Sequence, residues 1–156
     1  MTIALIWQII LIFIDKSGFN LAIIQYIGYG TWIFSVYFGL IPIWVFKKKG
    51  EVTKGDSYMK TKKLVDTGSY AIIRHPQYLA GILVSISITF WVQSFLSIIL
   101  TIIVTVLIYQ WTYSEDKQLI KKYGSDYIEY KRKVPRLNPV LGLILYLKNN
   151  QKDSKK

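Results

Sequence analysis

Residues 64–81, LVDTGSYAIIRHPQYLAG, decide how the rest of the chain is arranged. They place a turn, two tyrosines, an arginine and the only histidine of the chain directly before a long apolar run. These polar side chains are therefore expected at the level where water meets membrane. A site at that level is suited to bring a polar molecule into contact with an apolar one.

Charged and apolar residues are segregated on both sides of this stretch. Residues 1–14, 17–46 and 77–114 carry no charge, whereas every lysine and arginine except Lys16 lies in residues 47–76 or 114–156. The last two uncharged blocks reach or exceed the length of about 20 residues that crosses a bilayer as a helix. We therefore predict an all-α integral membrane protein.

The lengths of the blocks predict about four transmembrane helices in a single domain, residues 1–156. The first block, at 14 residues, gives about 21 Å of helix, so its full crossing is left open. The third block is too long for one straight span and is expected to fold back at Gln93-Ser94. The predicted parts are two spans in 1–46, a cytoplasmic loop with the site motif in 47–76, a helical hairpin in 77–113, cytoplasmic or interfacial helices in 114–147, broken at Gly124, and a solvated tail in 148–156.

The formal net charge of +11 indicates a membrane surface rather than nucleic acid as partner. The cations flank hydrophobic spans instead of covering a soluble surface, which is the positive-inside pattern. Both basic segments, and hence the candidate site, are therefore predicted on the cytoplasmic face. The chain has no cysteine, which excludes disulfides, thiolate catalysis and cysteine-based zinc sites, and we expect no metal.

Arg74-His75-Pro76 is the first element with chemical potential. Proline suits the first position of a helix, so His75 is expected near the N-cap, where unpaired backbone amides favour an anion. Arg74 adds forked donors that fit a carboxylate. The alternative is that Arg74 only extends to lipid headgroups and His75 only caps the helix.

Glu115-Asp116 is the second element, at the predicted cytoplasmic end of the fourth span. The positive-inside pattern and the helix dipole both favour cations there, so the two acids need a partner. An ammonium group or a ribose diol would serve, and so would Arg74 or Lys117 in an intraprotein ion pair.

The third element is the basic segment 127–139, which is typical of a surface attracted to anionic lipid. The side chains before and within it, Leu119, Tyr123, Tyr127 and Tyr130, have the spacing of one helix face. The three elements are expected to meet at one site, where the first offers an anion site, the second a cation or diol site, and the basic segment 127–139 a lid.

Taken in order, these residues resemble the isoprenylcysteine carboxyl methyltransferase and phospholipid methyltransferase family of integral membrane enzymes. The matching pattern covers roughly residues 60–140 and comprises Leu64-Val65, Gly68, Tyr70, Arg74-His75-Pro76, Tyr78, Gly81, Glu115-Asp116, Leu119, Tyr123-Gly124, Tyr127, Tyr130, Val134-Pro135-Arg136 and Pro139. The resemblance implies S-adenosylmethionine as methyl donor and S-adenosylhomocysteine as product, bound at the cytoplasmic face. The helical C-terminal segment would close this site, and a lipid-like or isoprenoid-linked acceptor would enter from the bilayer.

The resemblance also implies roles for single residues. The cofactor would contact Lys62, Lys63, Leu64, Val65, Tyr70, His75, Pro76, Gln77, Tyr78 and Glu115. The predicted catalytic residues are Arg74, Glu115 and Arg136. Arg74 and Arg136 would orient an anionic acceptor or the cofactor tail.

Two positions depart from the family pattern. Asp116 stands where a glutamate is usual, and its shorter side chain weakens the case for a role at that position. The arginine that faces a substrate carboxylate about one turn before the acidic pair is missing, and Trp111 lies near that place. Trp111 is the predicted substrate contact, suited to a flat, apolar or cationic group.

The predicted function is methyl transfer from S-adenosylmethionine to a lipid-like or isoprenoid-linked acceptor, by carboxylate O-methylation as in that family. One alternative is N-methylation of a phospholipid amino headgroup. An alternative of another class is a non-enzymatic membrane scaffold or lipid-binding protein, in which the charged elements are only interface anchors.

Overall fold

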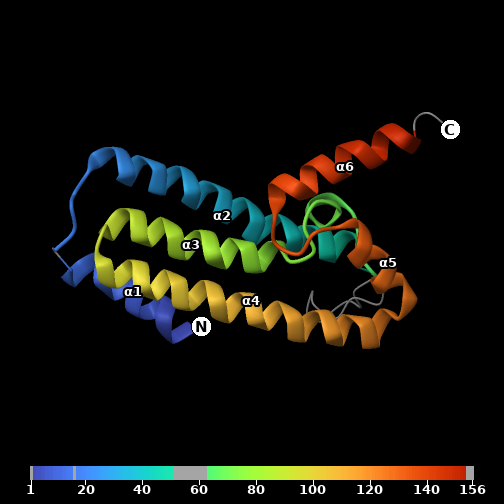
Figure 1. Cartoon of the computed structure of the whole chain (residues 1–156), viewed down its shortest axis with the longest axis horizontal. Helices are drawn as coiled ribbons and strands as arrows, with labels where there is room; N and C mark the ends of the chain where they lie inside the picture. Colours follow the sequence, from blue (N-terminus) through green and yellow to red (C-terminus); the bar gives the residue numbers. More distant parts are fainter. Residues whose placement is uncertain (1, 16, 51–62, 154–156) are drawn as a thin grey trace. The chain divides into compact units, whose positions relative to one another are not determined.

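All regular structure in the described part of the chain is helical. The computed structural model describes residues 2–15, 17–50 and 63–153 (Figure 1). Its helices are α1 (Thr2–Ile14), α2 (Ala22–Lys49), α3 (Pro76–Val92), α4 (Phe95–Tyr123), α5 (Ser125–Lys133) and α6 (Pro139–Asp153), with a 3-10 turn η1 (Gly68–Ala71) before α3. The predicted all-α fold class is confirmed for these residues.

Two helices, α2 and α4, are long and apolar enough to cross a membrane. Only 17% and 22% of their apolar windows are buried, which is unlike the core helix of a soluble protein. Helices α1 and α3 are apolar but shorter, at 13 and 17 residues. Two candidate spans are thus found among the described residues, and the count of four stays a prediction.

Several boundaries differ from the predicted ones. Helix α4 runs without a break through the acidic pair to Tyr123, and Gly124, at φ +60°, separates it from α5 as predicted. Helix α6 continues to Asp153, so residues 148–153, predicted as a tail, are helical. Residues 148–153 contain no glycine or proline, so nothing in this segment stops the helix.

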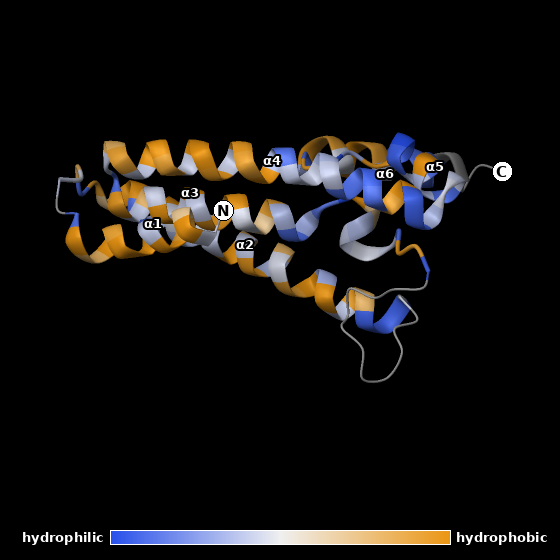
Figure 2. Cartoon of the chain, turned by 90° about the horizontal axis from the view of Figure 1, so that it is seen from below, coloured by the Kyte–Doolittle hydropathy of each residue, from blue (hydrophilic) through white to orange (hydrophobic). Residues whose placement is uncertain are grey.

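The chain forms two compact units. Unit 1 comprises Met1–Tyr37 and Tyr78–Tyr113, and unit 2 comprises Phe38–Gln77 and Ser114–Lys156. Every charged residue except Asp15 and Lys16 falls in unit 2. Figure 2 shows α1 and the first half of α4 largely hydrophobic and α5 largely hydrophilic. The segregation of charge read from the sequence is therefore also a division between compact units, while the single-domain description stays a prediction.

Unit 1 packs α1 against the α3–α4 hairpin. Leu11, Ile88 and Val92 form its buried cluster, against which Trp91 and Leu100 also pack. The hairpin turns at Gln93, as predicted, with φ +55°. The Gln93 side chain accepts a hydrogen bond from the Leu21 N–H (2.8 Å) and donates one to the Leu21 carbonyl (3.0 Å). The turn between α3 and α4 is therefore tied to the start of α2.

A buried polar network crosses this apolar unit. Gln8 of α1 is fully buried and donates to Thr101 Oγ1 of α4 at 2.7 Å. Its carbonyl oxygen accepts from the Ser85 hydroxyl of α3, also at 2.7 Å. Thr89 Oγ1 lies 2.6 Å from Thr101 Oγ1 and extends the network. Hydrogen bonds of this kind hold helices together where apolar contacts alone give no preference over lipid.

We expect Gln8→Ala to lower the free energy of unfolding by about 1 kcal/mol, because Ser85 and Thr101 lose their partner in an apolar surrounding. Thermal unfolding of the purified protein in detergent measures the change. The control is Ile9→Ala, because Ile9 is 48% exposed on the same helix. An equal effect of both variants would show that the network contributes nothing specific.

Candidate functional site

The Arg74-His75 motif is fixed by backbone hydrogen bonds to the segment that follows α5. The Arg74 N–H donates to the Pro135 carbonyl (3.0 Å) and the His75 N–H donates to the Arg136 carbonyl (3.2 Å). Helix α3 begins at Pro76, as predicted, so His75 directly precedes it. Two motifs about 60 residues apart are therefore held together by main chain, within unit 2.

The carboxylate of Asp116 is the centre of this arrangement. Arg74 Nη1 donates to both of its oxygens at 2.9 Å. Oδ1 also lies 2.9 Å from His75 Nε2 and accepts from the Tyr127 hydroxyl at 2.6 Å. Oδ2 accepts from Arg136 Nη2 at 2.9 Å. A carboxylate only accepts hydrogen bonds, so it sets the direction of all four donors.

The centre is buried and its charges are unequal. Asp116 is 2% exposed, and the side chains of Arg74 and Arg136 are 6% and 14% exposed. Two guanidinium groups thus share one carboxylate, which leaves one positive charge in excess. The neighbouring Glu115 supplies one further negative charge.

Tyrosines of α5 close the polar cluster on one side. Burial raises the pKa of the Tyr127 phenol, and its hydrogen bond to Asp116 raises it further. Burial also raises the pKa of Tyr130, whose hydroxyl donates to the Tyr70 carbonyl at 2.7 Å. Both phenols therefore stay protonated and act as donors. Tyr123, Tyr127 and Tyr130 pack in one cluster with Leu119, so the predicted shared face is confirmed although Gly124 divides it between two helices.

Some buried polar atoms of the cluster make no hydrogen bond within the described residues. Arg74 Nε, a donor, and Glu115 Oε2, an acceptor, are among them. Glu115 Oε2 lies 3.7 Å from His75 Nδ1, beyond hydrogen-bonding distance. Buried polar groups normally have partners, so both atoms point to a ligand that brings an acceptor and a donor. No group of three or more His, Asp or Glu placed to hold a metal occurs among the described residues.

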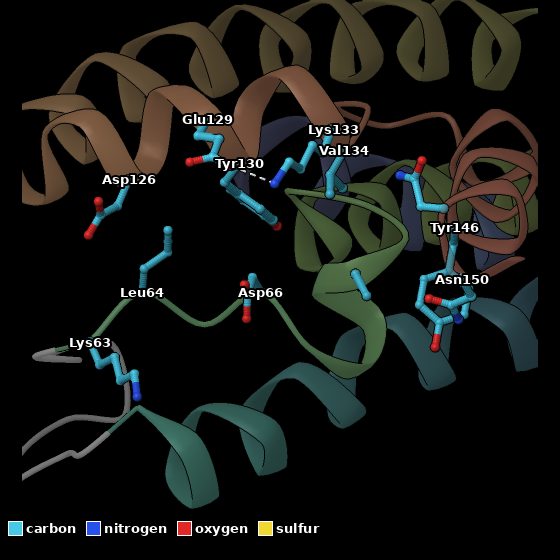
Figure 3. A pocket seen from close by; sticks show the side chains of 12 residues that line it. Lys63, Leu64, Asp66, Asp126, Glu129, Tyr130, Lys133, Val134, Tyr146 and Asn150 are labelled. Carbon is cyan, nitrogen blue, oxygen red and sulfur yellow. Dashed lines mark hydrogen bonds and ion pairs between the residues drawn. The ribbon is translucent and has the colours of Figure 1, made fainter. Parts of the chain in front are cut away.

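A cavity of about 590 Å³ also lies in unit 2 (Figure 3). Its lining comprises Lys63, Leu64, Asp66, Ala71, Asp126, Glu129, Tyr130, Lys133, Val134, Tyr146, Asn149 and Asn150. Figure 3 shows the segment with Leu64 and Asp66 opposite Asp126 and Tyr130, with the Leu64 side chain directed toward them. The Tyr130 ring, 5.7 Å from that of Tyr127, connects the cavity wall to the Asp116 cluster. Cavities of this size hold small organic ligands.

The structure brings only part of the predicted site residues together. Arg74, His75, Glu115 and Arg136 meet around Asp116, and Lys63 and Leu64 line the cavity. Val65 and Tyr70 lie in an apolar cluster with Val45, where the Tyr70 ring stacks on Phe46 at 4.6 Å. Pro76 is buried and Gln77 half-buried at the start of α3.

Gly68 allows this apolar cluster to form. It adopts φ +65°, and a Cβ there would meet Val45 Cγ2 at 3.2 Å. A side chain at this position would be strained by both conformation and contact. The glycine of the predicted pattern therefore has a local structural reason.

Three further predicted contacts do not belong to the described residues of unit 2. Tyr78 and Trp111 belong to unit 1, where Tyr78 is half-buried on α3 and Trp111 is 62% exposed on α4. Lys62 lies outside the described residues. Their roles stay predictions.

Sequence reasoning underrated Asp116 and did not include Tyr127 among the catalytic, cofactor or substrate contacts. The shorter side chain of Asp116 was expected to weaken the case for a role at that position, yet Asp116 accepts from four side chains and so has a structural role. The helix-dipole argument also fails, since the acidic pair lies inside α4, whose last turn carries Lys121 and Lys122. One signal was available in the sequence, namely an acid directly after an apolar span. Burying such an acid costs desolvation energy, so it needs hydrogen-bonding or charged partners.

Comparison with known proteins gives one family. The sequence model described as phospholipid methyltransferase matches residues 5–126. The match includes Arg74, His75 and the acidic pair, and it ends before Tyr127 and Arg136. No curated protein and no solved structure matches the chain.

We expect Asp116→Ala to lower the free energy of unfolding by about 3–5 kcal/mol, because it leaves two buried guanidinium groups without a carboxylate. Thermal or chemical unfolding in detergent measures the loss. Glu129→Ala is the control, since its pair with Lys133 is as short, at 2.6 Å, but exposed, and little change is expected. Equal losses in the two variants would contradict the central role of Asp116.

Proposed function

The chain belongs to the phospholipid methyltransferase family, and from that premise we propose that it transfers the methyl group of S-adenosylmethionine to a lipid acceptor at the cytoplasmic face of a membrane. The carrying observation is the pair of buried atoms beside Asp116, Arg74 Nε and Glu115 Oε2. One is a donor on a guanidinium group and the other is an acceptor on a carboxylate. This pair matches a zwitterion.

The amino-acid end of the cofactor is such a zwitterion. Its carboxylate fits the guanidinium groups of Arg74 and Arg136, which bind carboxylates through parallel donors. Its ammonium group fits Glu115 Oε2, 3.7 Å from the His75 ring. The predicted catalytic residues thus act here by binding and orienting, and Asp116 acts by positioning them.

We assign the adenosine end to the cavity lined by Lys63 and Leu64. Its volume of about 590 Å³ admits a nucleoside, and Tyr130 and Tyr146 offer aromatic faces to a base. Asp66, Asn149 and Asn150 supply acceptors and donors for a ribose diol and the base edge. The assignment agrees with the cofactor contacts at Lys63 and Leu64 implied by the family resemblance.

When bound, the cofactor supplies a sulfonium methyl group, which an acceptor lone pair takes in line while the carbon–sulfur electron pair goes to sulfur. The chain therefore needs no nucleophile of its own. Its residues contribute by holding the donor rigidly, so that the acceptor meets the methyl group at about 3–3.5 Å. Arg74, His75 and Asp116 are buried, so water has little access to the side chains that hold the methyl donor.

The acceptor atom is either a carboxylate oxygen or an amine nitrogen. A carboxylate attacks without losing a proton, whereas an ammonium group has to lose one first. The family description and the exposed Trp111, with no arginine one turn before Glu115, favour the amino headgroup of a phospholipid as the second candidate.

We expect the purified protein in detergent to bind S-adenosylhomocysteine, and His75→Ala and Glu115→Ala each to weaken that binding at least tenfold. Each removes a charged or hydrogen-bonding group of the cluster. Isothermal titration calorimetry measures the dissociation constants. Lys117→Ala is the control, because Lys117 is exposed two residues after Glu115.

A second variant separates the two ends of the ligand. Tyr146→Ala, in the cavity wall, is expected to weaken the binding of both S-adenosylhomocysteine and adenosine. Glu115→Ala is expected to weaken the binding of S-adenosylhomocysteine only. Absent binding in the wild type, or binding unchanged in both cluster variants, would favour the membrane scaffold.

Membranes incubated with the protein and methyl-tritiated S-adenosylmethionine are expected to yield labelled lipid. Methyl esters release the label in mild base, whereas N-methyl groups do not. Release therefore identifies carboxylate O-methylation and retention identifies N-methylation. No labelled lipid at all, from protein that binds the cofactor, would contradict a lipid acceptor.

A further inference from the structure

Helix α6 packs against the rest of unit 2 through one face. The Asn138 side chain accepts from the Leu141 N–H at 3.0 Å and caps the helix, which begins at Pro139. Gly142 is buried against the Ile72 carbonyl, so closely that a Cβ at this position would clash with it. Tyr146, further along this side, lines the cavity.

The opposite face of α6 is apolar and exposed. Val140, Leu143, Ile144 and Leu147 are 69%, 47%, 57% and 53% exposed. Their spacing of i, i+3, i+4 and i+7 places them on one stripe. A helix on the surface of a soluble protein turns polar residues outward, and α6 does the reverse over its first three turns. We call these four residues the α6 stripe.

The charge around the α6 stripe indicates what covers it. Unit 2 contains all but one of the lysines and arginines and carries the whole net charge of +11. In residues 114–151, seven exposed basic residues stand against two exposed acids. A second copy of the chain would bring the same positive charge to the contact, which opposes pairing. An anionic lipid surface offers both an apolar boundary and the opposite charge.

We propose that α6 lies in the plane of an anionic membrane surface, with the α6 stripe inserted at the boundary between headgroups and acyl chains. At 15 residues, about 22 Å, the helix is too short to cross a bilayer. The inserted face is opposite to Gly142, so lipid and the rest of unit 2 hold α6 from two sides. The proposal goes beyond the methyl transfer and does not depend on cofactor binding.

Spin labels test the proposal, because the chain has no cysteine and every introduced one is unique. Val140→Cys, Ile144→Cys and Leu147→Cys are labelled in the full protein and reconstituted in vesicles with 30% phosphatidylglycerol in phosphatidylcholine. Power saturation with oxygen and with a water-soluble nickel chelate measures the depth of each label. Lys148→Cys, beside the stripe, is the matched control.

An in-plane helix gives equal shallow depths at all three stripe positions, with the Lys148→Cys label accessible to nickel. Without phosphatidylglycerol, or in high salt, the stripe labels are expected to become at least threefold more accessible to nickel. A depth that grows by about 10 Å from Val140→Cys to Leu147→Cys would instead show an inserted helix and overturn the proposal. Stripe labels that are accessible to nickel, immobilised by a protein partner or insensitive to anionic lipid would overturn it as well.

Discussion

The shared carboxylate of Asp116 is the interaction on which the candidate site depends. It is buried, and it accepts from Arg74, His75, Tyr127 and Arg136, which come from three separate segments of unit 2. Burying such a group costs desolvation energy, and removing it would cost more, because two guanidinium groups would then stay buried without it. The cluster therefore fixes where these segments meet. The backbone hydrogen bonds from residues 74–75 to residues 135–136 hold the same contact independently of side chains.

A site of this kind is organised before any ligand arrives. Arg74 and Arg136 each donate to Asp116 through one terminal nitrogen. Because the guanidinium group is planar, the directions of its other N–H groups are then fixed as well. Glu115 and Arg74 each keep one buried atom without a hydrogen bond among the described residues, and this is where the cluster is incomplete. Positioning of this sort is what methyl transfer requires from a protein, since the reactive group belongs to the cofactor. Unit 2 also carries the exposed basic residues and the α6 stripe, so it combines a buried charged cluster with a basic surface.

Local signals predicted much of the fold. The start of α3 at Pro76 and the break at Gly124 follow from residues whose backbone preferences decide the structure within a few positions. The turn at Gln93 follows from the length of the uncharged block, which is too long for one straight span. The central role of Asp116 was not predictable in this way, because it depends on donors that lie 20 and 42 residues away. The same holds for Gln8, a lone polar residue in an apolar run whose partners lie on α3 and α4. Sequence patterns indicated that buried charges need partners, and only packing shows which partners they find.

The most direct test of this account compares two ligands that differ only at the amino-acid end. Wild-type protein in detergent is titrated with S-adenosylhomocysteine and with 5′-methylthioadenosine, which lacks the carboxylate and the ammonium group. If the cluster around Asp116 binds the zwitterion, S-adenosylhomocysteine binds at least tenfold more tightly, and Glu115→Ala reduces this difference without changing the affinity for 5′-methylthioadenosine. Equal affinities of the wild type for both ligands would contradict the account.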